Sequence, residues 1–228
     1  HNLIEKTPFH LNRFINKIPK QIYLSNFVQF ILRKLARHNK FYLYKTFIPK
    51  FADVLKLQYK LGDFPYAKLF EPSIPDAEVD LELRKNFKPE GGKSKFESYL
   101  RKLLPDIIPT IYLEGFENLI SKLNNGDFPE KPRVIFTGTG IYQDELFQAW
   151  TAKKINKGAI LAIVQHGGHY GNFEVSSEAM PHELSVADYY YSWGWTLKSE
   201  NIIPMPAIKA IGKSSDWSES GYITIMTR

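Results

Sequence analysis

The stretch Ala159–Gly171, AILAIVQHGGHYG, joins a short apolar run to a turn rich in glycine and histidine. The run Ile160–Val164 is β-branched at three positions, which predicts a strand that is buried on both faces. The turn begins directly after it and contains Gln165, His166, Gly167, Gly168, His169, Tyr170 and Gly171. Ligands bind beyond the carboxyl ends of strands in open parallel sheets, so this turn is the first candidate site.

The residue types of this turn suit chemistry. Glycines let the backbone approach a ligand closely, and histidines exchange protons near neutral pH. We take His166 and His169 as the candidate catalytic residues. His166 adjoins the strand end, so it is better placed to act as general base on an acceptor hydroxyl or as a cation facing a diphosphate. The alternative is a tight loop in which the glycines only turn the chain.

From residue 131 onward, strand and helix patterns alternate. Short apolar runs predict four strands, at Arg133–Phe136, Ile160–Val164, Ala187–Ser192 and Ile202–Pro204. A helix is predicted over Tyr142–Lys154, with its buried face formed by Leu146, Phe147 and Trp150. Strands separated by helices indicate an α/β fold with a parallel sheet and right-handed crossovers.

Two further turns follow predicted strands and are candidates for substrate binding. Thr137, Gly138 and Thr139 come before the helix, whose first N–H groups would be free to contact a phosphate. A plain strand-to-helix turn is an equally good interpretation, since the sequence lacks the known glycine-rich phosphate motifs. In the other turn, Ser192 and Trp193 are candidates, with Trp193 either stacked on a sugar or base or packed in the core. The glycine turn adds Gln165, Gly167, Gly168 and Tyr170 to this set.

Several classes of site find no support in the sequence. The chain has no cysteine, which excludes thiolate metal ligands and a cysteine nucleophile. The HExxH and Gly-x-Ser-x-Gly patterns are absent, and Glu174, His182, Glu183 and Asp188 have no spacing typical of a metal site. We therefore expect no metal. No nucleic-acid-binding module matches either.

The first sixty residues carry twelve Lys and Arg against two acids, Glu5 and Asp53, or about +10. This charge indicates an anionic partner, such as a phosphorylated acceptor or a membrane surface. Ile22–Tyr44 has helical spacing after the potential N-cap Ser25. Such a helix would lie on a membrane interface, or it would pack on the core with its basic face in solvent. No apolar run approaches the roughly 20 residues that span a bilayer.

The pattern divides the chain into three parts. Residues 1–130 are predicted to be mostly helical and basic, with helices at Pro49–Leu61, Lys95–Leu104 and Pro109–Asn124 and an irregular stretch at Phe70–Gly92. Residues 131–212 form the α/β core. Residues 213–228 contain a strand pattern at Gly221–Met226, which we interpret as the opening of a second domain. The chain begins at His1, without an initiator Met or a secretory signal, so we expect a processed or excised piece.

The part from Pro132 to Arg228 resembles a family of transferases encoded in bacterial surface-polysaccharide (O-antigen) gene clusters. The matching segments are RVIFTGTGIYQDELFQAWTAKKINKG, AIVQHGGHYG, ADYYYSWGW and DWSESGYITIMTR. The resemblance implies a GT-B-like glycosyltransferase with two facing Rossmann-like halves and the active site between them. It makes His166 the leading candidate for base or phosphate contact. In GT-B enzymes the second half binds most of the nucleotide-sugar donor, and here that half would be largely absent.

We therefore expect the acceptor-side half of a glycosyltransferase, which moves a sugar from a nucleotide-activated donor to a glycan or lipid-linked acceptor without a cofactor. Such a protein would be cytoplasmic, with peripheral binding to the inner face of the cytoplasmic membrane left open. The alternative is a non-catalytic α/β module that binds an anionic glycan or a membrane surface.

Overall fold

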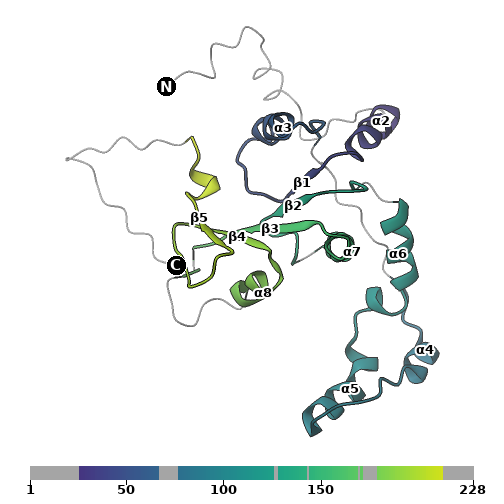
Figure 1. The fold of residues 1–228 in the computed structure, drawn as a ribbon. Coiled ribbons are helices and arrows are strands. Elements are labelled where there is room, and N and C mark those ends of the chain that lie inside the picture. Colours follow the sequence, from purple (N-terminus) through teal and green to yellow (C-terminus); the bar gives the residue numbers. More distant parts are fainter. Residues whose placement is uncertain are drawn as a thin grey trace, which may run out of the picture.

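The computed structural model describes residues 26–66, 77–125, 128–142, 144–168, 170–171 and 179–212. Strands and helices alternate between residues 134 and 192, whereas the described elements of residues 51–125 are all helical (Figure 1). In chain order they are α2 (Asn26–Ala36), β1 (Phe41–Tyr44), α3 (Phe51–Lys60), α4 (Leu81–Asn86), α5 (Lys95–Ile107), η1 (Thr110–Tyr112), α6 (Phe116–Asn125), β2 (Val134–Thr137), α7 (Glu145–Ile155), β3 (Ile160–Val164), α8 (Ala179–Val186), β4 (Tyr189–Ser192), β5 (Ile202–Pro204) and η2 (Ile208–Ala210).

The five strands form one parallel sheet in the order β1-β2-β3-β4-β5. Phe41 pairs with Val134, Val134 with Ile160, and Ala162 with Tyr189. The expected α/β fold with a parallel sheet is confirmed, and its arrangement is consistent with a Rossmann-like domain. The predicted strands at Ile160–Val164 and Ile202–Pro204 match β3 and β5 at both ends, while β2 and β4 begin one and two residues later than predicted.

Helices cover both faces of the sheet. Figure 1 shows α2 and α3 on one side and α7 and α8 on the other. On the side of α7, the inward residues Leu146, Phe147 and Trp150 are at most 2% exposed, which confirms the predicted buried face of this helix. None of the described helices is long and apolar enough to cross a membrane.

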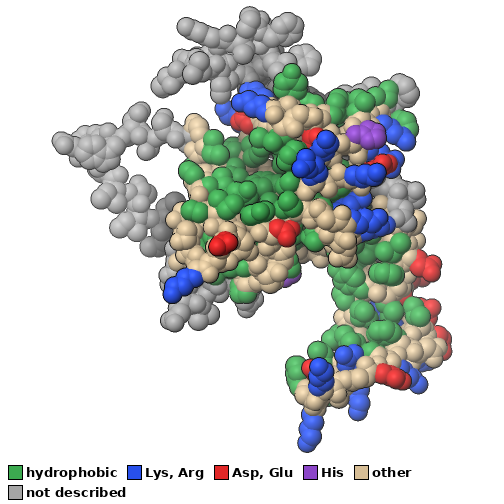
Figure 2. Space-filling view, viewed as in Figure 1, with side chains coloured by type: hydrophobic (Ala, Val, Ile, Leu, Met, Phe, Trp, Pro, Cys, Tyr) green, Lys and Arg blue, Asp and Glu red, His purple; other side chains and the backbone are tan. Residues whose placement is uncertain are grey.

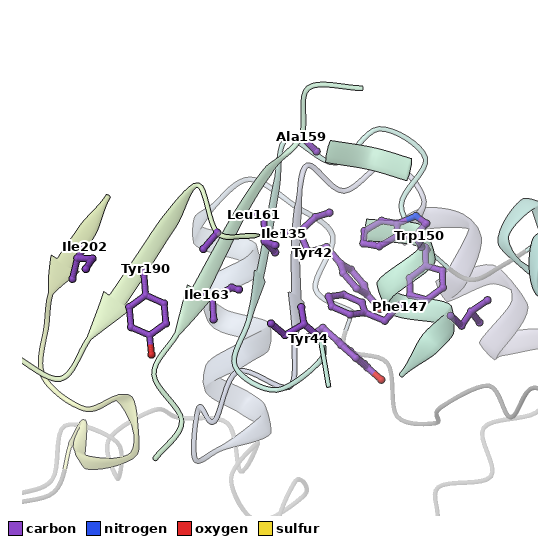
Figure 3. Close-up of a cluster of buried hydrophobic side chains, with 14 of the residues drawn as sticks. Tyr42, Tyr44, Ile135, Phe147, Trp150, Ala159, Leu161, Ile163, Tyr190 and Ile202 are labelled. Atoms are coloured by element: carbon purple, nitrogen blue, oxygen red, sulfur yellow. The ribbon is translucent and has the colours of Figure 1, made fainter. Parts of the chain in front are cut away.

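The prediction of one helix over Ile22–Tyr44 is wrong for its last residues, because β1 occupies Phe41–Tyr44. Its side chains alternate between partly exposed and buried positions, the period-2 pattern of a strand. Tyr42 and Tyr44 point into the core beside Phe147 and Trp150 (Figure 3). The ring centroids of Tyr42 and Trp150 are 5.0 Å apart in an edge-on contact, which adds to the burial of both rings. Tertiary packing of these aromatic rings explains why the segment pairs with β2 and does not extend α2.

Three further predictions before residue 131, one of an irregular stretch and two of helices, also need correction. The expected irregular stretch contains α4, whose first turn is capped by the Asp80 carboxylate accepting from the Leu83 N–H. Helix α5 continues to Ile107 through Pro105, where it was predicted to stop. The predicted helix Pro109–Asn124 is broken into η1 and α6 at Gly115, whose N–H donates to the Thr110 carbonyl. The helix predicted at Pro49–Leu61 is confirmed as α3.

Helix α8 was not predicted from the sequence, and Pro181 in its first turn weakens the helical pattern. The strand expected at Gly221–Met226 and the whole of 213–228 lie outside the described residues. The proposed division at residues 130 and 212 stays a prediction. The sheet nevertheless includes β1, which comes from the part that was expected to be mostly helical.

Residues 77–114 form a lobe that carries α4 and α5 and stands away from the sheet (Figures 1 and 2). None of its residues is buried, so it has no apolar core of its own. An ion pair holds it together: Arg84 Nε lies 2.6 Å from Glu114 Oε1, and the same guanidinium donates to the carbonyls of Pro105 and Ile108. The hydrogen bond from Arg84 lowers the pKa of Glu114 to about 2.

The stability of this lobe should therefore depend on pH. The pKa of Glu114 is lower in the folded chain than the ordinary value of 4.5, so its pairing with Arg84 stabilises the lobe above that pH. The contribution should fade as the pH falls from about 4.5 to about 2. Glu114→Gln should remove it at neutral pH, with roughly tenfold faster hydrogen exchange in peptides from residues 80–108 and no change in the sheet.

The matched control is Glu117→Gln, which alters an exposed glutamate in α6. Equal exchange in wild type and Glu114→Gln would show that the ion pair does not hold the lobe.

Candidate functional site

The turns that follow β3 and β4 are tied together by Gln165, which is only 3% exposed. Its side-chain oxygen accepts from the Trp193 N–H at 2.7 Å and from the Trp195 indole at 2.8 Å. Its side-chain nitrogen donates to the Gly167 carbonyl at 2.6 Å. Gln165 therefore clamps the two turns together at the carboxyl ends of the strands, and its predicted contact with substrate stays a prediction.

Two of the predicted substrate-binding hydroxyls are used inside their own turns. Thr137 is fully buried, and its Oγ1 accepts from the Gly140 N–H at 3.0 Å. Ser192 is also fully buried, and its hydroxyl donates to the Trp195 carbonyl. Both side chains therefore stabilise the backbone of the site, while Thr139 and Trp193 remain partly exposed.

The imidazole of His166 stands just beyond the end of β3, with 27% of its side chain exposed. Three aromatic rings surround it: Phe47 at 6.2 Å, Tyr142 at 5.6 Å and Tyr170 at 5.3 Å between ring centroids. They come from the ends of β1, β2 and β3. The site thus assembles residues from three strands around one titratable side chain that solvent can reach.

A buried carboxylate lies against this imidazole. Glu183, from α8, is fully buried, and its Oε1 is 3.2 Å from His166 Nδ1. The same oxygen accepts hydrogen bonds from the hydroxyls of Tyr142 and Tyr170, the latter at 3.1 Å. Burial, and then the hydrogen bond to Glu183, raise the pKa of Tyr142 far above its usual range. The sequence had suggested Glu183 only as a weak metal-ligand candidate, because nothing in its spacing signals burial.

Phe47 was also missed. It follows β1 in a turn where Lys45 and Phe47 have φ values of 47° and 61°, which non-glycine residues rarely adopt. A Cβ on Gly138 would lie 2.4 Å from the Phe47 ring, so glycine at 138 leaves room for that ring. Lys209 Nζ lies 4.4 Å from the centre of the same ring and 3.1 Å from the His166 carbonyl. Gly138 therefore has a packing role that does not require a ligand.

Gly167 and Gly168 differ from the other glycines of the site. Neither has a positive φ. A Cβ on Gly167 would lie 3.6 Å from the Tyr170 ring, and a Cβ on Gly168 would meet no heavy atom of a described residue within 4 Å. At Gly171, by contrast, φ is +73° and a Cβ would lie 2.7 Å from the Trp195 ring. Backbone strain and close packing among the described residues explain Gly171 but not Gly167 and Gly168.

His169 lies outside the described residues, so its predicted catalytic role stays a prediction. Within the described ranges, no group of three or more histidine or acidic side chains is arranged to hold a metal ion.

Gln165→Leu should loosen the junction between the two turns. The change leaves the Trp193 N–H and the Trp195 indole without their acceptor, which typically costs about 1–3 kcal/mol of unfolding free energy. We expect a lower thermal midpoint together with a change in tryptophan fluorescence, since Trp193 and Trp195 adjoin the altered site. Gln148→Leu, at a partly exposed position in α7, is the control. Unchanged stability and fluorescence in Gln165→Leu would contradict its role as a clamp.

No curated protein matches the sequence, and no solved structure matches the chain. The model of a family described as LIC12162 family transferase matches residues 5–227, nearly the whole chain. The chain therefore belongs to the LIC12162 family of transferases.

Proposed function

We propose that this transferase moves a sugar from a nucleotide-activated donor to a hydroxyl group of a glycan or lipid-linked acceptor, with His166 as the general base. One observation carries the proposal: a partly exposed imidazole at the carboxyl end of β3 that is paired with a buried carboxylate. A base within reach of an acceptor hydroxyl is what such a transfer requires.

The proposed reaction is a direct transfer of the sugar from the donor to the acceptor oxygen. The acceptor O–H gives its proton to the imidazole, and the acceptor oxygen forms a bond to the anomeric carbon of the sugar. The bond between that carbon and the phosphate oxygen of the donor breaks, and the nucleotide leaves with the bonding electrons. The imidazolium then forms 3.2 Å from the Glu183 carboxylate, which offsets its charge. The proposal involves no metal and no cofactor other than the donor substrate.

The GT-B resemblance divides these tasks between two halves of an enzyme. The carboxyl edge of the present sheet would receive the acceptor. The other Rossmann-like half of such an enzyme would bind most of the donor. The proposal sets the reaction in the biosynthesis of a bacterial surface polysaccharide, in the cytoplasm, and at the inner face of the cytoplasmic membrane if the acceptor is lipid-linked. The basic charge of the first sixty residues supports an anionic acceptor or lipid.

His166→Gln in the full-length protein should lower kcat by roughly 10²–10⁴, the usual contribution of general-base catalysis. The donor is first identified by calorimetry with a panel of UDP, GDP, CMP and CDP sugars, and turnover is then measured with that donor. The donor affinity and the thermal midpoint should stay close to those of wild type.

His182→Gln, which changes an exposed histidine in α8, is the control and should keep wild-type turnover. Near-normal turnover in His166→Gln would reject His166 as the base. Glycan binding without nucleotide binding or turnover would favour the non-catalytic module.

Gly168→Val tests whether substrate approaches the turn at Gly168. Since a Cβ at this position meets no described residue within 4 Å, the fold should tolerate the change with less than about 1 kcal/mol of lost stability. Acceptor binding should weaken, seen as a raised KM. Gly140→Ala makes the opposite contrast, because its Cβ would lie 2.7 Å from Phe147 Cε1 and should destabilise the fold by about 1–3 kcal/mol. Unchanged acceptor KM in Gly168→Val would place the substrate elsewhere.

A further inference from the structure

We infer that Glu183 is a positioning residue, which fixes the tautomer and orientation of His166 so that Nε2 is the basic nitrogen. The inference rests on the proposed function for its catalytic meaning. Its structural content, the location of the proton on the imidazole, can be tested without any substrate.

The proton on His166 is located by the hydrogen-bonding chemistry of His166 and Glu183. An ionised carboxylate only accepts hydrogen bonds, so the nitrogen that faces it must carry the proton. His166 Nδ1 is 3.2 Å from Glu183 Oε1. A neutral imidazole has one N–H, and with that proton on Nδ1 the lone pair lies on Nε2.

The hydroxyl of Tyr170 is 3.1 Å from His166 Nδ1, 3.3 Å from Nε2 and 3.1 Å from Glu183 Oε1. This hydroxyl has a single proton to donate, and a carboxylate is a stronger acceptor than a neutral ring nitrogen. We assign the proton to the bond with Glu183, which leaves the Nε2 lone pair available to an acceptor hydroxyl.

The fully buried carboxylate of Glu183 is held by hydrogen bonds from neighbouring tyrosines. Burying an ionised group costs several kcal/mol unless hydrogen bonds replace its water. Tyr142 and Tyr170 both donate to Oε1. Oε2 makes no hydrogen bond of ordinary geometry to a described residue, and the Tyr190 hydroxyl lies near the same carboxylate. Burial, and then the charge of Glu183, raise the pKa of Tyr190. The half-satisfied carboxylate gains when a positive charge develops on the adjoining imidazole.

A purely structural role is the alternative, in which Glu183 only attaches α8 to the end of β3. Both roles predict lost stability when Glu183 is changed. They differ in the imidazole: the positioning role requires the tautomer of His166 to change when the carboxylate is removed, and the structural role does not.

The test is nitrogen NMR of the 228-residue chain with labelled histidine, in wild type and Glu183→Gln, with His166→Gln to assign the signal. Wild type should show His166 protonated at Nδ1. Glu183→Gln should shift the population toward the Nε2–H form while the other histidine signals stay in place. Glu200→Gln, at an exposed position before β5, should leave the His166 signal unchanged. An unchanged tautomer in a folded Glu183→Gln chain would overturn the inference.

Tyr170→Phe keeps the inference testable if Glu183→Gln fails to fold. Its tautomer should match wild type, because Nδ1 still faces the carboxylate. A shift to the Nε2–H form in Tyr170→Phe would assign the orientation of the ring to Tyr170 and overturn the role of Glu183.

In the full-length enzyme, Glu183→Gln should lower kcat by roughly 10²–10⁴ with little change in the KM of the acceptor. A tautomer shift in a protein whose His166→Gln variant turns over normally would reject the proposed function while leaving the positioning of His166 in place. A tautomer shift without any loss of kcat in Glu183→Gln would overturn the positioning role in catalysis.

Discussion

Parallel pairing of five strands in one continuous register is the constraint on which the rest of this structure depends. Because each strand runs parallel to its neighbours, all five carboxyl ends come out at the same edge of the sheet. Residues that are more than 100 positions apart in the chain, such as Phe47 and His166, meet there as a result. The sheet therefore brings the residues of the site together, and the loops adjust their positions. Gln165 links the turns after β3 and β4 through hydrogen bonds from Trp193 and Trp195, and it makes a third hydrogen bond to Gly167 within its own turn.

The sheet and the α4–α5 lobe are stabilised by different interactions, and this difference decides which of them can hold a reacting side chain rigidly. The sheet is fixed by an aromatic core around Trp150, whose ring lies 4.7 Å from Phe128 and 5.0 Å from Tyr42 between centroids. The α4–α5 lobe has no such core and relies on the ion pair between Arg84 and Glu114. A reacting group needs rigid support to keep its geometry, and such support is present at His166, where Tyr170 belongs to the buried core and Tyr142 packs against it. The lobe cannot offer comparable support.

Features that depend on neighbouring residues were predicted from the sequence, and features that depend on contacts between distant residues were not. Strand β3 and the inward face of α7 are encoded by local apolar patterns, so both were predicted with little error. Strand β1 was assigned to a helix because Phe27, Phe30 and Ile31 have helical spacing, and four residues of alternating pattern do not override it. Glu183 carries no local signal at all. Its burial depends on α8 packing against the end of β3, a contact between parts of the chain that the sequence pattern does not relate.

The glycines of the site look alike in the sequence but have different surroundings in the structure. The sequence treats Gly138, Gly167, Gly168 and Gly171 alike, as residues that permit close approach of a ligand. The structure separates them, because the Phe47 ring fills the space at Gly138 and the Trp195 ring fills it at Gly171. At Gly167 a Cβ would lie 3.6 Å from the Tyr170 ring, and at Gly168 it would meet no described residue within 4 Å. The imidazole of the neighbouring His166 faces a buried carboxylate through Nδ1. In such a low-polarity setting the interaction of carboxylate and imidazolium is stronger than it would be in water, so Glu183 would stabilise the imidazolium that the proposed proton transfer forms.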